Sequence, residues 1–144
     1  MRLVEIPKDL VPKVWPVAVP YLAQAVARAR DTADLQEEYE SVINGAEQLW
    51  IVVDEDHENK VVAAGTTTLK RYRTGKLFCD ILLFGGTGMF GSEDAPGWFQ
   101  KKNELETWAR AQHCHSIRVF ARKGWAKHLK EYKMTHVILE KELT

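Results

Sequence analysis

The sequence has few of the residues that hold small proteins together through cross-links or metal ions. Only two cysteines, Cys79 and Cys114, occur among 144 residues. Two cysteines cannot make a disulfide framework, so we expect both to be reduced residues of the core. His113 and His115 flank Cys114, but no CxxC or HxxxH pattern supplies the further ligands that a zinc site needs. We therefore predict no metal site.

Excess charge and long apolar runs are also absent. Lysine plus arginine and aspartate plus glutamate both total 20, so the formal net charge is zero. No overall field draws such a chain to nucleic acid or to an anionic membrane. The basic clusters at 70–73 and 122–127 contain aromatic residues, as binders of single strands do, but we interpret them as solvated faces.

The apolar runs are far too short to span a membrane, and the first residues lack the hydrophobic stretch of a signal peptide. We therefore expect a cytoplasmic protein without a membrane partner. The composition, 45% hydrophobic and 28% charged, is that of an ordinary globular protein. With no repeat or linker-like segment, the sequence predicts a single domain over residues 1–144.

Apolar periodicity and turn residues predict alternating helices and strands. We expect strands at residues 3–6, 49–53, 61–69, 77–84, 117–121 and 136–141. We expect helices at 11–30, 98–112 and 125–132. A further helix is expected between a cap at residues 31–32 and its end at Gly45. Pro16 and Pro20 interrupt the first helix, so its regular part is expected to begin near one of them or to be kinked.

These elements predict how the strands pair. The strands at 49–53 and 61–69 form an antiparallel hairpin across a polar turn. The helix at 98–112 connects two strands as a crossover, which makes that pair parallel. The predicted fold is α/β: a mixed, mostly antiparallel sheet with one parallel β-α-β crossover and helices on both faces.

A glycine-rich loop follows the strand at 77–84. Residues 84–91 read Phe-Gly-Gly-Thr-Gly-Met-Phe-Gly and precede an amphipathic helix. Such a loop exposes backbone N–H groups, and the helix N-terminus adds its positive dipole, so a phosphate fits there. Glu93 and Asp94 precede the same helix, where carboxylates stabilise the N-terminus and repel phosphate. We favour this capping role over a phosphate site at the helix N-terminus. For the glycine-rich loop itself, the alternative to phosphate binding is a plain connection whose glycines supply positive φ.

The order of the elements and several segments resemble the GNAT superfamily of acyl-CoA N-acyltransferases. Residues 48–56 (Gln-Leu-Trp-Ile-Val-Val-Asp-Glu-Asp) and 61–65 (Val-Val-Ala-Ala-Gly) are similar to its second and third strands. Residues 105–114 and 116–120 resemble its crossover helix and fifth strand, and residues 124–137 its penultimate helix and last strand. More loosely, residues 122–125 and the long second helix resemble GNAT-like proteins encoded in phage and prophage genomes.

The resemblance implies transfer of an acyl group from acetyl-CoA, or a related thioester, to a small-molecule or protein amine. It assigns the pantetheine arm and the thioester carbonyl to the backbone of Leu82, Leu83 and Phe84. It assigns the diphosphate to the amides of Gly86, Thr87 and Gly88. The acid for the departing thiolate is then Tyr132 or Cys79, and the base for the amine is Asp80 or Glu5.

Two positions depart from the family pattern. Leu83 stands where the phosphate loop normally begins with arginine or glutamine, and Leu129 stands where many members place a catalytic tyrosine. The alternative function is therefore a catalytically silent GNAT-fold protein, associated with phage particles, that binds a partner or serves a structural role. For a protein partner or a homo-oligomer, the expected contact residues are Trp15, Tyr21, Met89 and Phe90.

Overall fold

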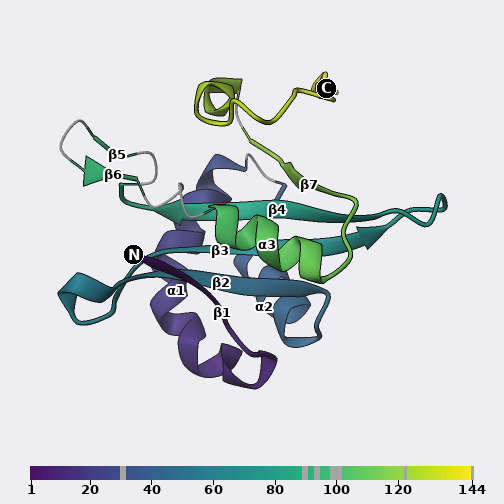
Figure 1. Cartoon of the computed structure of the whole chain (residues 1–144). Coiled ribbons are helices and arrows are strands. Elements are labelled where there is room, and N and C mark those ends of the chain that lie inside the picture. The colour runs from purple at the N-terminus through teal and green to yellow at the C-terminus, as the bar shows by residue number, and fades with distance from the viewer. Residues whose placement is uncertain (30–31, 89–90, 93–94, 98–101, 122, 144) are drawn as a thin grey trace.

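A five-stranded sheet with helices on both faces forms the body of the protein (Figure 1). The computed structural model describes residues 1–29, 32–88, 91–92, 95–97, 102–121 and 123–143. The sheet strands are β1 (Arg2–Glu5), β2 (Glu47–Asp54), β3 (Lys60–Arg71), β4 (Leu77–Gly86) and β7 (Ser116–Val119). The helices are α1 (Val11–Arg28), α2 (Leu35–Ile43) and α3 (Lys102–Ala111), and β5 (Gly91–Ser92) pairs with β6 (Ala95–Pro96).

The strand order is β1-β2-β3-β4-β7, and every neighbouring pair is antiparallel except β4 and β7. Helix α3 makes the crossover between these two parallel strands. Both the predicted antiparallel hairpin and the predicted parallel crossover are confirmed. The strand expected at 3–6 is β1, which lies at one edge of the sheet.

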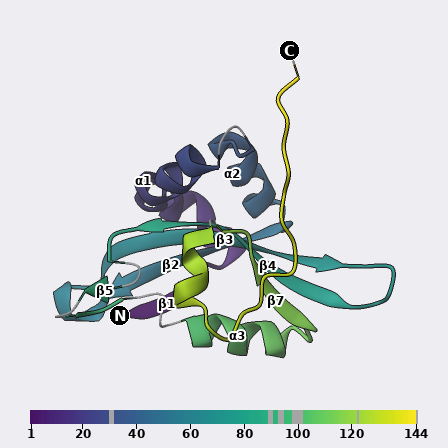
Figure 2. The same ribbon diagram turned by 90° about the horizontal axis from the view of Figure 1, so that it is seen from above.

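Alternation along the strands gives each face of the sheet its own core. Helices α1 and α2 cover one face, and α3 covers the other (Figure 2). Leu49 and Ile51 point toward α1 and α2, whereas Trp50 and Val52 point toward α3. The Trp50 indole N–H donates to the Thr67 hydroxyl over 2.9 Å, which satisfies a polar group inside the second core.

Helix α1 begins at Val11, so the expected start near Pro16 or Pro20 is wrong. Pro12, Pro16 and Pro20 are spaced four residues apart and all three are exposed. Pro16 and Pro20 each remove one hydrogen bond from the helix interior, whereas Pro12 stands in the first turn, where an N–H has no partner within the helix. The opposite side packs Ala18 and Leu22 into the core.

Helix α2 is capped by Asp34, whose carboxylate accepts a hydrogen bond from the Glu37 N–H over 3.2 Å. The expectation that Thr32 caps this helix is therefore wrong, because the cap is Asp34. The Thr32 hydroxyl instead donates to the carbonyl of Ala29 after the end of α1. Asp31 lies outside the described residues.

The C-terminal region differs most from the expectation. Residues 123–128 form a 3-10 helix in place of the helix expected at 125–132, since only Trp125 and Leu129 of that stretch pack on the sheet before Tyr132. The strand expected at 136–141 is wrong, because residues 132–143 contain no helix or strand and no described strand lies beside them. Within the described residues, no helix is both long enough and apolar enough to cross a membrane.

Candidate functional site

The parallel strands β4 and β7 separate partway along their length. Their pairing runs from Phe78 opposite Ser116 to Ile81 opposite Val119, and the Phe120 N–H then donates to the Ile81 carbonyl over 3.3 Å. Strand β7 ends there, whereas β4 continues to Gly86. Among the described strands, none pairs with this far half of β4 on the side away from β3.

A β-bulge at Leu82 coincides with this separation. On β3, Thr66 lies opposite Leu83 and Thr67 lies opposite Ile81, which leaves Leu82 without a partner in the ladder. A bulge bends its strand and redirects the backbone groups of the extra residue. The bend therefore turns the end of β4 away from β7, and the two strands open like a V.

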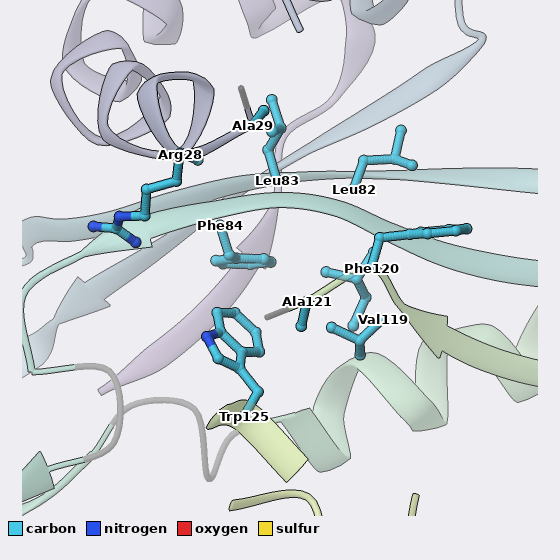
Figure 3. Close-up of a pocket in the computed structure, with 11 residues that line it drawn as sticks. Arg28, Ala29, Leu82, Leu83, Phe84, Val119, Phe120, Ala121 and Trp125 are labelled. Atoms are coloured by element: carbon cyan, nitrogen blue, oxygen red, sulfur yellow. The ribbon is translucent and has the colours of Figure 1, made fainter. Parts of the chain in front are cut away.

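A small pocket of about 110 Å³ occupies the opening of this V (Figure 3). Its lining comes from the end of α1, from β4, from the residues after β7 and from the 3-10 helix. These residues are Ala25, Arg28, Ala29, Ile81, Leu82, Leu83, Phe84, Val119, Phe120, Ala121 and Trp125. Figure 3 shows the ring of Phe84 next to the indole of Trp125 at one side of the pocket.

Apart from Arg28, the side chains of the described lining residues are apolar. None of the described lining residues is a carboxylate, a histidine, a tyrosine or a cysteine. Arg28 contributes a charged group, and it is exposed at the C-terminal end of α1. The described lining therefore offers a ligand apolar side chains, one guanidinium and backbone groups.

The structure brings together three of the residues predicted to hold a cofactor, because Leu82, Leu83 and Phe84 all line the pocket. Gly86 lies at the end of β4 opposite Ala63. The Thr87 N–H donates to the Val62 carbonyl over 3.4 Å, so the alternation of an antiparallel ladder turns the Gly86 N–H away from β3.

Glycine is required at Gly86, where φ is 152° and a Cβ would lie 2.5 Å from that of Ala63. Gly88 has a φ of 69° with open space around it. Of the three predicted phosphate donors, Thr87 already uses its amide within the sheet. The capping residues Glu93 and Asp94 lie outside the described residues.

Asp80, predicted as a catalytic base, is buried and paired with Arg118. The Arg118 guanidinium donates to both carboxylate oxygens, over 2.6 and 2.7 Å, and to the Tyr72 hydroxyl over 2.7 Å. These bonds raise the pKa of Arg118, and its guanidinium also stacks 4.6 Å from the Phe78 ring centre. Asp80 is not among the residues that line the pocket, and its pairing ties β4 to β7.

Tyr132, predicted as a catalytic acid, lies in the core between the sheet and α3. Its hydroxyl donates to Glu106 over 3.2 Å, and burial, followed by the Glu106 charge, raises the pKa of Tyr132. Cys79, the other predicted acid, is fully buried, and burial raises the pKa of its thiol to about 12. None of these groups lines the pocket.

Two of the predicted partner-binding residues pack against the core. Trp15 contacts Tyr39 with ring centres 5.0 Å apart, and the Tyr21 hydroxyl donates to the Val61 carbonyl over 2.8 Å. Both residues are partly buried against the core beneath α1 and α2. Met89 and Phe90 lie outside the described residues.

Sequence reasoning missed Arg28 and Trp125 as residues of the pocket. Arg28 lies 49 residues before the start of β4 at Leu77, and nothing in its local pattern marks it. Trp125 carries no charged or acid–base group that would mark it, and it also packs against the core on the α3 side. Only the placement of α1 and of the 3-10 helix beside the V brings both side chains to the site.

Solved structures with a similar fold include several acetyltransferases. An aminoglycoside acetyltransferase from an uncultured soil metagenomic sample superposes with a TM-score of 0.68 at 12% identity, covering 99% of this chain and 96% of that one. A GNAT family acetyltransferase from Staphylococcus aureus gives 0.64 at 12% identity, covering 99% and 98%. Glucosamine-6-phosphate N-acetyltransferase from Arabidopsis thaliana gives 0.61 at 10% identity, covering 99% and 98%.

These similarities extend over the whole chain and show that it has the GNAT fold. No protein-family model and no curated protein matches the sequence. At 10–12% identity the structural likeness shows the fold alone. The chemistry therefore has to be argued from the residues at the V between β4 and β7.

Proposed function

We propose that this protein is an N-acyltransferase that moves an acyl group from acetyl-CoA, or a related thioester, to an amine. The observation that carries the proposal is the V between β4 and β7, with an apolar pocket at its opening and a bulge at Leu82 beside it. Because no described strand pairs with this edge of β4, a ligand that lies along it can reach the backbone groups of β4.

The described residues fit a thioester with a long, mostly apolar arm. Leu82, Leu83 and Val119 supply apolar walls for that arm, and the N–H of Gly86 faces the open edge at its far end. Arg28 supplies positive charge at the rim for an anionic group. Acetyl-CoA would bring an acyl group already activated as a thioester, which an amine attacks directly.

The proposed contribution of the protein is positioning and polarisation. Backbone dipoles fixed by the fold stabilise developing charge on a carbonyl oxygen without reorganising during the reaction. No described residue of the pocket has a side chain that could serve as a general acid or base. Such a group typically accelerates a reaction by about 10²–10⁴-fold, and that acceleration is missing here. We therefore expect slow turnover, with the amine's proton passing to water.

The acid role of Tyr132 and the base role of Asp80 stay predictions. The bond from Tyr132 to Glu106 and the pairing of Asp80 with Arg118 favour structural roles for both residues. The acceptor class, a small-molecule or a protein amine, likewise stays a prediction, because the pocket describes only the donor side.

The first experiment measures binding of acetyl-CoA by thermal shift and by calorimetry. A ligand present at 100 times its Kd adds about 2.7 kcal/mol of stability, which raises the Tm of a chain of this size by roughly 5–10 °C. Arg28→Glu should weaken binding about tenfold or more, because it places negative charge beside the anionic ligand. Arg110→Glu is the matched control, since Arg110 is an exposed residue of α3 outside the pocket.

The absence of any shift at millimolar acetyl-CoA would refute the proposal. Equal weakening by Arg28→Glu and Arg110→Glu would place the binding site elsewhere. Turnover is then followed as free thiol released from acetyl-CoA in the presence of a panel of primary amines.

A second candidate is a GNAT-fold protein that binds a partner without catalysis, in the phage-associated setting that the looser resemblance suggests. It is favoured by one observation, which is that no described lining residue is suited to acid–base chemistry. Binding of acetyl-CoA without thiol release for any amine, together with recovery of the protein in a stoichiometric assembly, would support this candidate over the enzyme.

A further inference from the structure

The C-terminal segment, residues 136–143, has a sequence suited to a strand but lies unpaired. It reads His-Val-Ile-Leu-Glu-Lys-Glu-Leu, with β-branched and apolar residues in a continuous run. Val137, Ile138, Leu139 and Leu143 are 70%, 84%, 92% and 87% exposed. Large apolar side chains gathered on one exposed segment mark a surface that another surface covers.

The sheet offers an edge for such a segment. Strand β7 is the last strand of the sheet and pairs only with β4 among the described strands. Its outer edge therefore presents unpaired N–H and C=O groups, which readily pair with a further strand. Phe120, directly after β7, is 57% exposed and extends the apolar surface of this edge.

The direction of the segment favours a second copy of the chain over its own body. Leu129 is buried and Tyr132 is bonded to Glu106, so the chain is anchored up to residue 132. From there it leaves as an extended chain, and its end lies away from the rest of the molecule, past α2 in the view from above (Figure 2). Residues 137–143 make no hydrogen bond or ion pair with any other described residue.

We propose that two copies of this chain exchange their C-terminal segments, each pairing with the outer edge of β7 on the other. The six residues at 136–141 span about 20 Å when extended, enough to cover the four residues of β7 and the position of Phe120. The exchange is reciprocal, so a closed two-fold dimer results and both exposed segments and both free edges are covered at once. This dimer differs from the predicted partner surface around Trp15 and Tyr21.

The experiment is sedimentation equilibrium of the full chain from about 1 to 100 μM, the range in which a micromolar dimer forms. The expected mass is twice the 16.5 kDa of the chain. Ile138→Pro removes a backbone N–H and blocks strand pairing, and Leu139→Asp places charge on the covered face. Both variants should be monomeric and keep the far-UV circular dichroism of the body, whereas the control Lys141→Gln should stay dimeric.

A wild-type protein that remains monomeric throughout this range would overturn the proposal, including the case in which the segment folds back on its own β7. A dimer that persists in Ile138→Pro would overturn it as well, because the contact would then lie on another face. Binding of acetyl-CoA is a separate readout, so the outcome is independent of the proposed enzymatic function.

Discussion

Replacing Arg118 with methionine would remove the side chain that ties β7 to β4 through Asp80. The Asp80 carboxylate would then lie in the sheet without its two charged hydrogen bonds of 2.6 and 2.7 Å. Methionine keeps the apolar length of the arginine stem, so the packing against Phe78 is largely preserved. The substitution therefore isolates the effect of the missing charge.

The expected loss of stability follows from the burial of the two partners. Breaking a buried ion pair by removing one partner costs about 3–5 kcal/mol, because the remaining charge is left uncompensated. The side chain of Asp80 is 4% exposed and that of Arg118 is 24% exposed. The carboxylate left behind is the more buried partner, which favours a large loss, but water can enter the space that Arg118 filled. We therefore expect Arg118→Met to lower the free energy of unfolding by about 3 kcal/mol, the lower end of that range. For a chain of this length, that corresponds to a fall in Tm of roughly 10 °C.

The assay is a double-mutant cycle measured by urea unfolding of the wild type, Arg118→Met, Asp80→Leu and the double variant. Replacing both members of a buried pair with apolar residues is often neutral, so the double variant should lie within about 1 kcal/mol of the wild type. The coupling energy should then exceed about 2 kcal/mol, as it does for residues of one buried network.

A coupling energy below about 0.5 kcal/mol, with a loss under about 1 kcal/mol for Arg118→Met, would refute this reasoning. Asp80 would then not be committed to the arginine and would be available for the catalytic role predicted from the sequence. The cycle thus decides between a structural and a chemical use of the same carboxylate.

Two further predictions test the packing of α1 and the buried carboxyl of Glu47. A Cβ at Gly85 would lie 2.0 Å from the Tyr21 carbonyl oxygen, so Gly85→Ala should cost about 2–3 kcal/mol in urea unfolding, whereas Gly124→Ala, which meets nothing within 4 Å, should cost little. Burial, and then the neighbouring Glu38 carboxyl, raise the pKa of Glu47 from 4.5 to about 8. The folded state then keeps a proton that the unfolded chain releases, so wild-type stability should fall between pH 4.5 and about 8. Glu47→Gln should lack this fall in thermal melts, and equal pH slopes in both proteins would contradict the assignment.

Local patterns in the sequence were sufficient for most of the sheet. The apolar run at 49–53 and the polar turn after it predicted β2 and β3, because a short buried strand and its turn depend on neighbouring residues alone. The crossover at 98–112 predicted the parallel pair through the handedness and length of such connections. Leu82, Leu83 and Phe84, which the family resemblance assigned to the cofactor, all line the pocket.

Features that depend on distant partners were not predictable in the same way. The exposure of the proline side of α1 is a property of its packing, so Pro16 and Pro20 wrongly indicated a later start. The strand-like sequence at 136–141 pairs with none of the described strands of its own chain. The ion pair of Asp80 was not predicted, because its partner Arg118 lies 38 residues away in the sequence.

The prolines of α1 have a further consequence for how quickly the chain refolds. The continuous helix requires the bonds before Pro12, Pro16 and Pro20 to be trans, and no described peptide bond is cis. In unfolded chains each such bond is cis in about 10–30% of molecules, so roughly a quarter to two thirds would carry at least one wrong isomer among the three. Those molecules would wait tens to hundreds of seconds before α1 closes over the sheet, and a prolyl isomerase would shorten the wait.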